Sequence, residues 1–223
     1  MAPPGMTTRR LLRDQIERLW NGGELDLVRR NYRADVVDHM PVPGQLGGLE
    51  GMEQVVREFR AAMPDLSMEL HGVLVDGDRG CDFWTLSGTN TGPLFGRPPT
   101  GERVRMSGID MVRVAGGQVA ELWHVEEMAR FEAQLGWAEA APDDADAALR
   151  AAAPDLRLTV EARIVEGDLA ATRWTAEGTH TGAPLLGVPP RGRRFRIAGM
   201  EVARAGVPLL RVAELAQARA QLA

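Results

Sequence analysis

The sequence contains no lysine, and all 26 of its basic residues are arginine. Without lysine the chain can form no Schiff base with a carbonyl substrate, and it cannot use a phosphate loop that depends on a lysine side chain. The single cysteine, Cys81, excludes an intrachain disulfide and is typical of a reducing compartment. One thiol and four scattered histidines do not form a structural zinc site. We therefore expect neither a metal nor an organic cofactor.

Long hydrophobic runs and a strong positive charge are also absent. No segment approaches the roughly 20 apolar residues of a membrane helix, and the first residues lack the apolar stretch of a signal peptide. The net charge is −5, and the one basic cluster, residues 191–196, lies in a strand-like segment that we interpret as a solvated strand face. These features predict a cytoplasmic protein that binds neither a membrane nor nucleic acid.

A repeat with an offset of about 90 residues organises the chain. The motif Pro64-Asp65-Leu66 returns as Pro154-Asp155-Leu156. Further matches in the same order are Asp76-Gly77-Asp78 with Glu166-Gly167-Asp168, Trp84-Thr85 with Trp174-Thr175, and Gly88-Thr89 with Gly178-Thr179. So many matches in one register predict an internal duplication. We expect a complete unit over residues 7–136, a linker over 137–144 and a shortened unit over 145–223.

The complete unit has the hydrophobic patterns of helices followed by strands. A helix is predicted over residues 9–20, because Leu12, Ile16 and Leu19 fall on one helical stripe. A short helix near 28–32, a strand near 36–40 and a helix over 51–63 follow. Four strands, over 66–75, 81–91, 103–114 and 118–125, are separated by glycine-rich turns, and a short helix near 127–135 ends the unit.

The second unit has no counterpart of the first two helices. Its pattern predicts a helix over 146–153 followed by three strands, with Pro208 interrupting what should be the last strand. A unit without these helices cannot cover one face of its own sheet. We therefore predict that this sheet packs against the first unit as an intrachain pseudo-dimer, and whether two chains form a homodimer stays open.

Six motifs of the complete unit occur in the order found in one known family. They are Trp20-Asn21-Gly22-Gly23, the segment Tyr32 to His39, Met63-Pro64-Asp65-Leu66, the segment Gly88 to Gly92, the segment Gly108 to Arg113, and Glu121-Leu122-Trp123-His124-Val125. In these motifs the chain resembles the SnoaL-like polyketide cyclases, also called predicted ester cyclases. The resemblance implies the α+β nuclear transport factor 2-like fold, a cone in which a curved antiparallel sheet wraps N-terminal helices around a pocket for an apolar small molecule.

The resemblance also implies a reaction. Family members of known activity close a polyketide ring by intramolecular aldol condensation, without a metal or organic cofactor, and use an acidic side chain on the last strand as acid and base. The position that resembles this carboxylate is His124, and the position that resembles the second polar group, one strand earlier, is Asp110. The two residue types are thus exchanged, although a histidine can perform the same proton transfers.

Asp110 and His124 form a pair only if the last two strands have the right register. A three-residue loop at 115–117 would place both side chains on one face of the sheet, whereas a two-residue loop would place them on opposite faces. On one face, the carboxylate would fix the tautomer of the ring and raise its pKa. The acid recurs as Glu201 in the shortened unit, which we expect to have lost the segment equivalent to His124. A purely structural hydrogen bond is therefore the alternative.

The remaining candidate catalytic and substrate-binding residues are chosen by their expected positions in the cone-shaped fold. Asp38 and His39 lie at its mouth, where this fold often places its base, and their alternative is a strand end that points to solvent. Six aromatic, thioether or amide side chains are candidates for substrate binding, although such residues also fill ordinary cores. They are Trp20, Met52, Phe59, Trp84, Asn90 and Met111.

Three functions remain open from the sequence. The first is a cofactor-free cyclase that acts on a polyketide-like intermediate by acid and base catalysis. The second is an epoxide hydrolase or an epoxide-opening cyclase of the polyether type, which would use the same pair of residues. The third is a protein that binds an apolar small molecule without chemistry.

Overall fold

The computed structural model describes residues 4–42 and 44–223. The first copy consists of two N-terminal helical segments, a further helix pair with a short strand between them, four long strands and a closing helix. These elements are α1 (Pro4–Asp14), the π-helix η1 (Gln15–Trp20), α2 (Asp26–Asn31), β1 (Tyr32–Asp38), α3 (Gly48–Ala62), β2 (Ser67–Asp76), β3 (Arg79–Thr89), β4 (Arg103–Ala115), β5 (Gln118–Glu126) and α4 (Met128–Gln134). Within the described ranges, no helix has the length and hydrophobicity needed to cross a membrane.

The five strands of the first copy form one sheet in the order β1-β5-β4-β3-β2. Strand β1 runs parallel to β5, and the other pairs are antiparallel. Because side chains alternate between the faces of a strand, the even-numbered residues of β3, β4 and the end of β5 point to the helices, and the odd-numbered ones point away from them. The helical face holds the candidate site, and the other face is apolar.

The second copy has four strands, one more than the sequence predicted. Its elements are α5 (Ala145–Ala152), β6 (Arg157–Glu166), β7 (Leu169–Thr179), β8 (Arg194–Arg204), β9 (Val207–Ala213) and α6 (Leu215–Leu222), and the sheet order is β6-β7-β8-β9. Pro208 lies inside β9 beside a shift in register between β8 and β9, where the ladder needs no N–H donor from it. The expectation that Pro208 removes the last strand was therefore wrong.

Both sheets contain extra residues at equivalent places. In the first antiparallel strand pair of each copy one residue has no partner in the ladder, His71 in β2 and Glu161 in β6. In the last strand the extra residue is Ala120 in β5 and Leu209 in β9. Because bulges are specific irregularities of a strand pair, this agreement supports the internal repeat independently of the sequence motifs.

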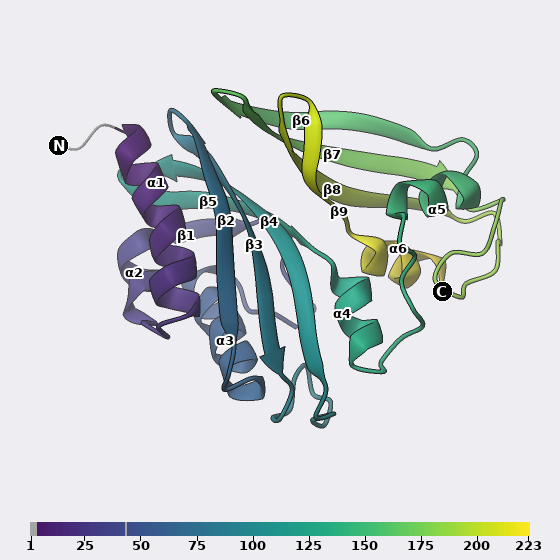
Figure 1. Cartoon of the computed structure of the whole chain (residues 1–223), viewed down its shortest axis with the longest axis horizontal. Helices are drawn as coiled ribbons and strands as arrows, with labels where there is room; N and C mark the ends of the chain where they lie inside the picture. Colours follow the sequence, from purple (N-terminus) through teal and green to yellow (C-terminus); the bar gives the residue numbers. More distant parts are fainter. Residues whose placement is uncertain (1–3, 43) are drawn as a thin grey trace.

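The two sheets lie face to face, with α1, α2 and α3 on the outer side of the first sheet (Figure 1). The buried cluster between the sheets combines side chains of both copies, among them Ile109 and Met111 from β4 with Met200 and Val202 from β8. At its edge the Arg173 guanidinium lies 4.9 Å from the centre of the Trp123 ring. The opposite face of the second sheet is partly open, since Val160 is 65% exposed.

Candidate active site

A cavity of about 70 Å³ lies between the first sheet and the helices η1 and α3. Trp20, Met52 and Phe59 line it from the helical side, and the Trp84 ring lines it from β3. Four titratable side chains of the sheet also line this largely apolar space, Asp38, Asp110, His124 and Glu126.

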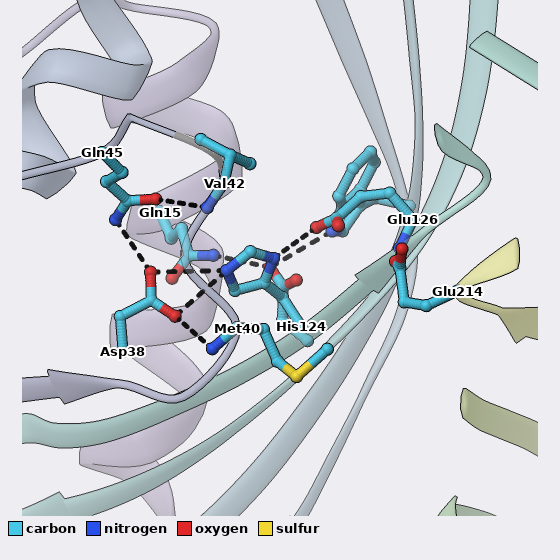
Figure 2. Close-up of polar contacts among 10 residues, drawn as sticks. Gln15, Asp38, Met40, Val42, Gln45, His124, Glu126 and Glu214 are labelled. Carbon is cyan, nitrogen blue, oxygen red and sulfur yellow. Dashed lines mark hydrogen bonds and ion pairs between the residues drawn. The ribbon is translucent and has the colours of Figure 1, made fainter. Parts of the chain in front are cut away.

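The His124 ring lies between two carboxyl groups, as Figure 2 shows. Its Nδ1 is 2.7 Å from Oε1 of Glu126, and its Nε2 is 3.2 Å from Oδ1 of Asp38. Glu126 lies on the same strand, two residues further on, and Asp38 ends the neighbouring parallel strand β1. Two acceptors on opposite ring nitrogens stabilise the doubly protonated imidazolium, because each N–H of this form then has a partner.

Asp38 is held in place by the segment that follows β1. The backbone N–H of Met40 donates to its Oδ1 at 2.9 Å, and the Gln45 amide donates to its Oδ2 at 2.9 Å. The Gln45 side chain is itself fixed, since its Oε1 accepts the backbone N–H of Val42 at 3.0 Å. These donors hold the carboxylate toward the ring (Figure 2).

Burial and charge act in opposite directions on this pair. Burial alone would lower the pKa of His124, but the charges of Glu126 and Asp38 and their hydrogen bonds outweigh it and raise the pKa well above its usual value. Burial alone would raise the pKa of Asp38, but the hydrogen bond from His124, the ring's charge, and the Met40 and Gln45 donors lower it. Near neutral pH the favoured state is therefore an imidazolium beside an ionised Asp38.

Asp110 faces His124 directly across the β4–β5 pair. Its Oδ2 accepts the Gln15 amide at 2.7 Å and the Trp84 indole N–H at 3.2 Å, and Gln15 in turn accepts the Tyr32 hydroxyl at 2.5 Å. Burial raises the pKa of Asp110 to about 7, although the charge of His124 and the Trp84 bond oppose this. Asp110 can therefore hold or release a proton near neutrality.

Asp82 lies behind Asp110 on the next strand, and the two residues pair directly across β3 and β4. Asp82 is completely buried, and neither of its oxygens has a hydrogen-bond donor among the described residues. Burial, reinforced by the charge of Asp110, raises the pKa of Asp82 well above its usual value, so that the neutral form of Asp82 is favoured beside Asp110.

The structure brings together most of the residues that the sequence singled out. His124, Asp110, Asp38 and four of the six candidate binding residues line the cavity. The other candidates lie elsewhere. His39 stacks on Trp123 on the opposite face of the sheet, and its Nε2 is 2.9 Å from Glu121. Met111 belongs to the cluster between the sheets, and Oδ1 of the Asn90 side chain accepts the backbone N–H of Thr100 in a loop, which is a structural role.

The route by which Asp110 and His124 become neighbours differs from the expected one. The turn between β4 and β5 has two residues, Gly116 and Gly117, since Ala115 pairs with Gln118. This turn alone would have placed the two side chains on opposite faces. The extra residue Ala120 shifts the register by one and restores the pair. The expectation that a two-residue loop would separate Asp110 from His124 was thus wrong, because a bulge was not foreseen.

Sequence reasoning missed four polar residues of the site. Glu126 could have been found, because it follows His124 by two residues on a strand and so shares its face. Gln15 is a polar residue within the apolar stripe of the first helix, which was also a signal. Gln45 lies in a loop, and Asp82 lies within a continuous run of buried residues in β3, so neither has a local pattern that indicates the cavity.

In the second copy the equivalent pair is an ion pair of a different kind. Glu201 faces Arg211 across β8 and β9, as Asp110 faces His124, and Nη1 of Arg211 donates to Glu201 at 2.7 Å. Nε of Arg211 is also 2.9 Å from the Asp146 carboxylate. An arginine side chain stays protonated near neutral pH and so cannot act as an acid or a base there. The second copy therefore retains the segment that was expected to be lost but holds no acid–base pair at these positions. Within residues 4–42 and 44–223, no group of three or more His, Cys, Asp or Glu side chains is arranged to hold a metal ion.

Comparison with known families agrees with this geometry. A model of the SnoaL-like polyketide cyclase family matches residues 10–135 and, a second time, residues 139–206. The two segments span most of the chain, and the protein belongs to the SnoaL-like polyketide cyclase family. No curated protein sequence matches the chain significantly.

Solved structures resemble one copy rather than the whole chain. TsrD from Streptomyces laurentii is 26% identical, with a TM-score of 0.54 over 59% of this chain and 96% of its own. Wild-type IdmH from Streptomyces antibioticus, a candidate polyketide cyclase, is 27% identical, with a TM-score of 0.51 over 58% of this chain and 98% of its own. AclR from Streptomyces galilaeus, a candidate hydroxylase, is 24% identical, with a TM-score of 0.54 over 62% of this chain and 91% of its own, and shows the fold alone.

Proposed function

We propose that the protein is a cofactor-free cyclase that closes a ring of a polyketide-like substrate by an intramolecular aldol reaction in the first copy. One observation carries this proposal: two titratable groups of adjacent strands, His124 and Asp110, face one apolar cavity with no intervening residue. Acid and base catalysis of this reaction needs two such groups, one to accept a proton from carbon and one to deliver a proton to oxygen.

The proposed steps need no further reactant. Ionised Asp110 removes a proton from the carbon next to a carbonyl, and the resulting enolate carbon attacks a second carbonyl carbon of the same molecule. A carbon–carbon bond forms as the carbonyl π bond breaks, and the His124 imidazolium gives its proton to the developing alkoxide. Asp110 then carries the abstracted proton, which returns to His124 and restores both groups. The product is an isomer of the substrate.

The environment supports these roles. Asp38 and Glu126 hold the ring and stabilise its charged form, while the apolar walls exclude water from an enolate intermediate. A pKa of about 7 for Asp110 gives both of its forms near neutral pH. Trp20 and Phe59, whose ring centres are 5.7 Å apart, supply aromatic surface for a flat substrate.

The test is turnover of an aromatic β-keto ester that carries a second carbonyl placed to close a six-membered ring, followed by mass spectrometry for a product of unchanged mass. His124→Gln is expected to lower the rate by roughly a hundredfold to ten-thousandfold, as removal of a general acid does. Asp110→Asn is expected to lower it comparably, with little change in KM, because the apolar walls supply most of the binding.

Glu201→Gln is the matched control, since Glu201 is the counterpart of Asp110 in the second copy. It should leave turnover nearly unchanged. Full turnover by His124→Gln would contradict the proposal and favour a protein that only binds its ligand. An equal loss in Asp110→Asn and Glu201→Gln would show that the acid is structural in both copies.

A second candidate reaction is the opening of an epoxide, and the Asp110 carboxyl group favours it, because a pKa of about 7 keeps part of this group neutral near neutral pH. A buried neutral carboxylic acid can protonate an epoxide oxygen as the ring opens. Offering an aryl epoxide distinguishes the two functions. Hydrolysis would add the mass of one water molecule to the product, whereas the aldol reaction adds none.

A further inference from the structure

The carboxyl group of Glu214 comes from the second copy but lies beside the acid–base residues of the first. Glu214 follows β9 and precedes α6, and it is only 5% exposed. Its Oε1 accepts the backbone N–H of Glu126 at 2.7 Å. Glu126 is the residue whose carboxylate contacts Nδ1 of His124, also at 2.7 Å. Figure 2 shows this order of groups, from Glu214 through Glu126 to the ring. Glu214 does not line the cavity, so it acts on the site through Glu126.

The equivalent residue of the first copy behaves differently. Glu127 also connects the last strand to the closing helix, and its backbone N–H donates to Ser107 at 3.0 Å, as that of Glu214 donates to Ala198 at 3.0 Å. The side chain of Glu127 stays within its own copy, where it accepts the N–H of Ser107 at 3.2 Å. Of these two glutamates, Glu214 alone makes a side-chain hydrogen bond to the other copy. The turn before the closing helix therefore makes local contacts in the first copy, whereas in the second copy it contacts Glu126 next to the candidate active site.

The surroundings of Glu214 favour a neutral carboxylic acid. Burial and the charge of Glu126 raise the pKa of Glu214 to about 8. The titratable groups that act on it are Glu126 and His124 on β5 and Glu132 on α4, and Glu132 is paired with Arg219 of α6. A neutral acid can accept the Glu126 N–H with one oxygen without adding a second full charge beside the Glu126 carboxylate.

We propose that Glu214 is a positioning residue that holds the end of β5, and with it Glu126, against the His124 ring, so that the second copy completes the proton-transfer site of the first. That Glu214 affects catalysis rests on the proposed function. That Glu214 positions Glu126 beside the His124 ring does not depend on it. Without the Glu214 acceptor the Glu126 backbone N–H would be buried and unpaired, and the strand end would shift to regain a partner.

The test is a histidine NMR titration of the full chain without substrate. The protein has only four histidines, so the His124 signals can be assigned by their loss in His124→Gln. Glu214→Ala is expected to lower the pKa of His124 by roughly half a unit to one unit, because the Glu126 carboxylate withdraws from Nδ1. Glu214→Gln, which keeps an acceptor oxygen and resembles the neutral acid, is expected to restore the wild-type titration. In turnover, Glu214→Ala should lower kcat with KM nearly unchanged.

Glu127→Ala is the matched control and should leave the His124 titration unchanged. An unchanged titration in folded Glu214→Ala would overturn the inference, and so would an equal shift in Glu127→Ala, which would show a general loosening of the strand end. If Glu214→Ala does not fold, Glu214→Asp, which withdraws the carboxyl group by one methylene, is expected to give the same shift, and its absence there overturns the inference. Because the titration needs no substrate, a failed turnover assay of the proposed function would not alter its outcome.

Discussion

The proton affinity of His124 is set by its neighbours rather than by the ring itself. Asp38 and Glu126 contact the two ring nitrogens, and they outweigh the burial that would otherwise favour the neutral form. The pKa of Asp110 is also raised, but by the opposite cause, since burial favours its neutral form. One small cavity thus contains an acid and a base whose proton affinities were both shifted from their usual values, which is the arrangement expected of proton-transfer sites.

The pairing of Asp82 with Asp110 leads to a prediction at the same scale. Asp82→Asn keeps the size of the side chain and supplies an amide donor to the Asp110 carboxylate, which stabilises its ionised form. The pKa of Asp110 is therefore expected to fall below about 7. Titration of carbon-13-labelled carboxyl groups by NMR measures this change.

The control for that change is Thr172→Asn, because Thr172 occupies the position of Asp82 in the second copy. It should leave the Asp110 titration as it is in the unmodified protein. An unchanged Asp110 titration in Asp82→Asn would mean that the side chain at position 82 does not influence the Asp110 carboxyl group.

At the scale of elements, β3 and β4 are in close contact where the Trp84 indole crosses Gly108. A Cβ added at Gly108 would lie 2.3 Å from the Trp84 ring, and one added at Gly199 would lie 2.1 Å from the Trp174 ring. Each sheet thus needs glycine at this point because a tryptophan occupies the space. Only the first tryptophan lines the cavity and donates to Asp110.

Substitution at these two glycines should show whether a loss of stability can occur without a loss of turnover. Gly108→Ala and Gly199→Ala are each expected to lower the free energy of unfolding by about 1–3 kcal/mol through overpacking. Gly108→Ala alone should also reduce turnover, because it displaces Trp84 from Asp110. Chemical denaturation and turnover measured on both variants check this, and equal activity losses would contradict the assignment of the site to the first copy.

The elements themselves were largely predictable from the sequence, and the errors have local causes. The 3.6-residue spacing of Leu12, Ile16 and Leu19 indicated the first helix, although not that its second half is a π-helix. The register of β5 was not predictable, because the bulge at Ala120 depends on pairing with β4 rather than on a local motif. For the same reason Pro208 was misjudged, since a bulge makes room for it in β9.

Residues of the candidate site were predictable only where they belong to a family motif or where side-chain alternation along a strand places them on the same face. His124, Asp110 and Asp38 were identified, and alternation along β5 would have added Glu126. Because neighbouring side chains alternate between the two faces of a sheet, His39 points to the face opposite Asp38, although the two residues are adjacent. Glu214 could not have been placed by sequence, because its contact with Glu126 joins residues 88 positions apart in two different copies.

At the scale of the whole molecule, buried acids in both copies predict how stability depends on pH. Asp110, with a pKa of about 7, and Glu214, with a pKa of about 8, keep protons in the folded state that an unfolded chain releases near its ordinary carboxyl pKa. His124 also retains its proton to higher pH when folded. The folded state therefore binds more protons than the unfolded one between about pH 5 and pH 8, and the free energy of unfolding falls as pH rises through this window.

Denaturant unfolding at several pH values across that window measures the dependence. The acids whose pKa is lowered by hydrogen bonds, such as Asp38, Asp65 and Asp155, oppose the trend only below about pH 4. The double variant Asp110→Asn, Glu214→Gln is expected to show a flatter profile. A stability that rises from pH 5 to pH 8 would show that these acids are ionised in the folded protein.

The ion pair of Glu201 and Arg211 has a consequence for stoichiometry. In an assembly of two identical subunits each sheet would carry its own site, and ligand binding at one site could influence the other. Here the position of His124 holds an arginine in the second copy, and among the described residues the helical segment η1, which forms one wall of the first cavity, has no counterpart there. One chain accordingly offers one site of this kind, so that titration with a ligand should saturate at one equivalent per chain, with a simple hyperbolic curve, since cooperativity requires at least two sites.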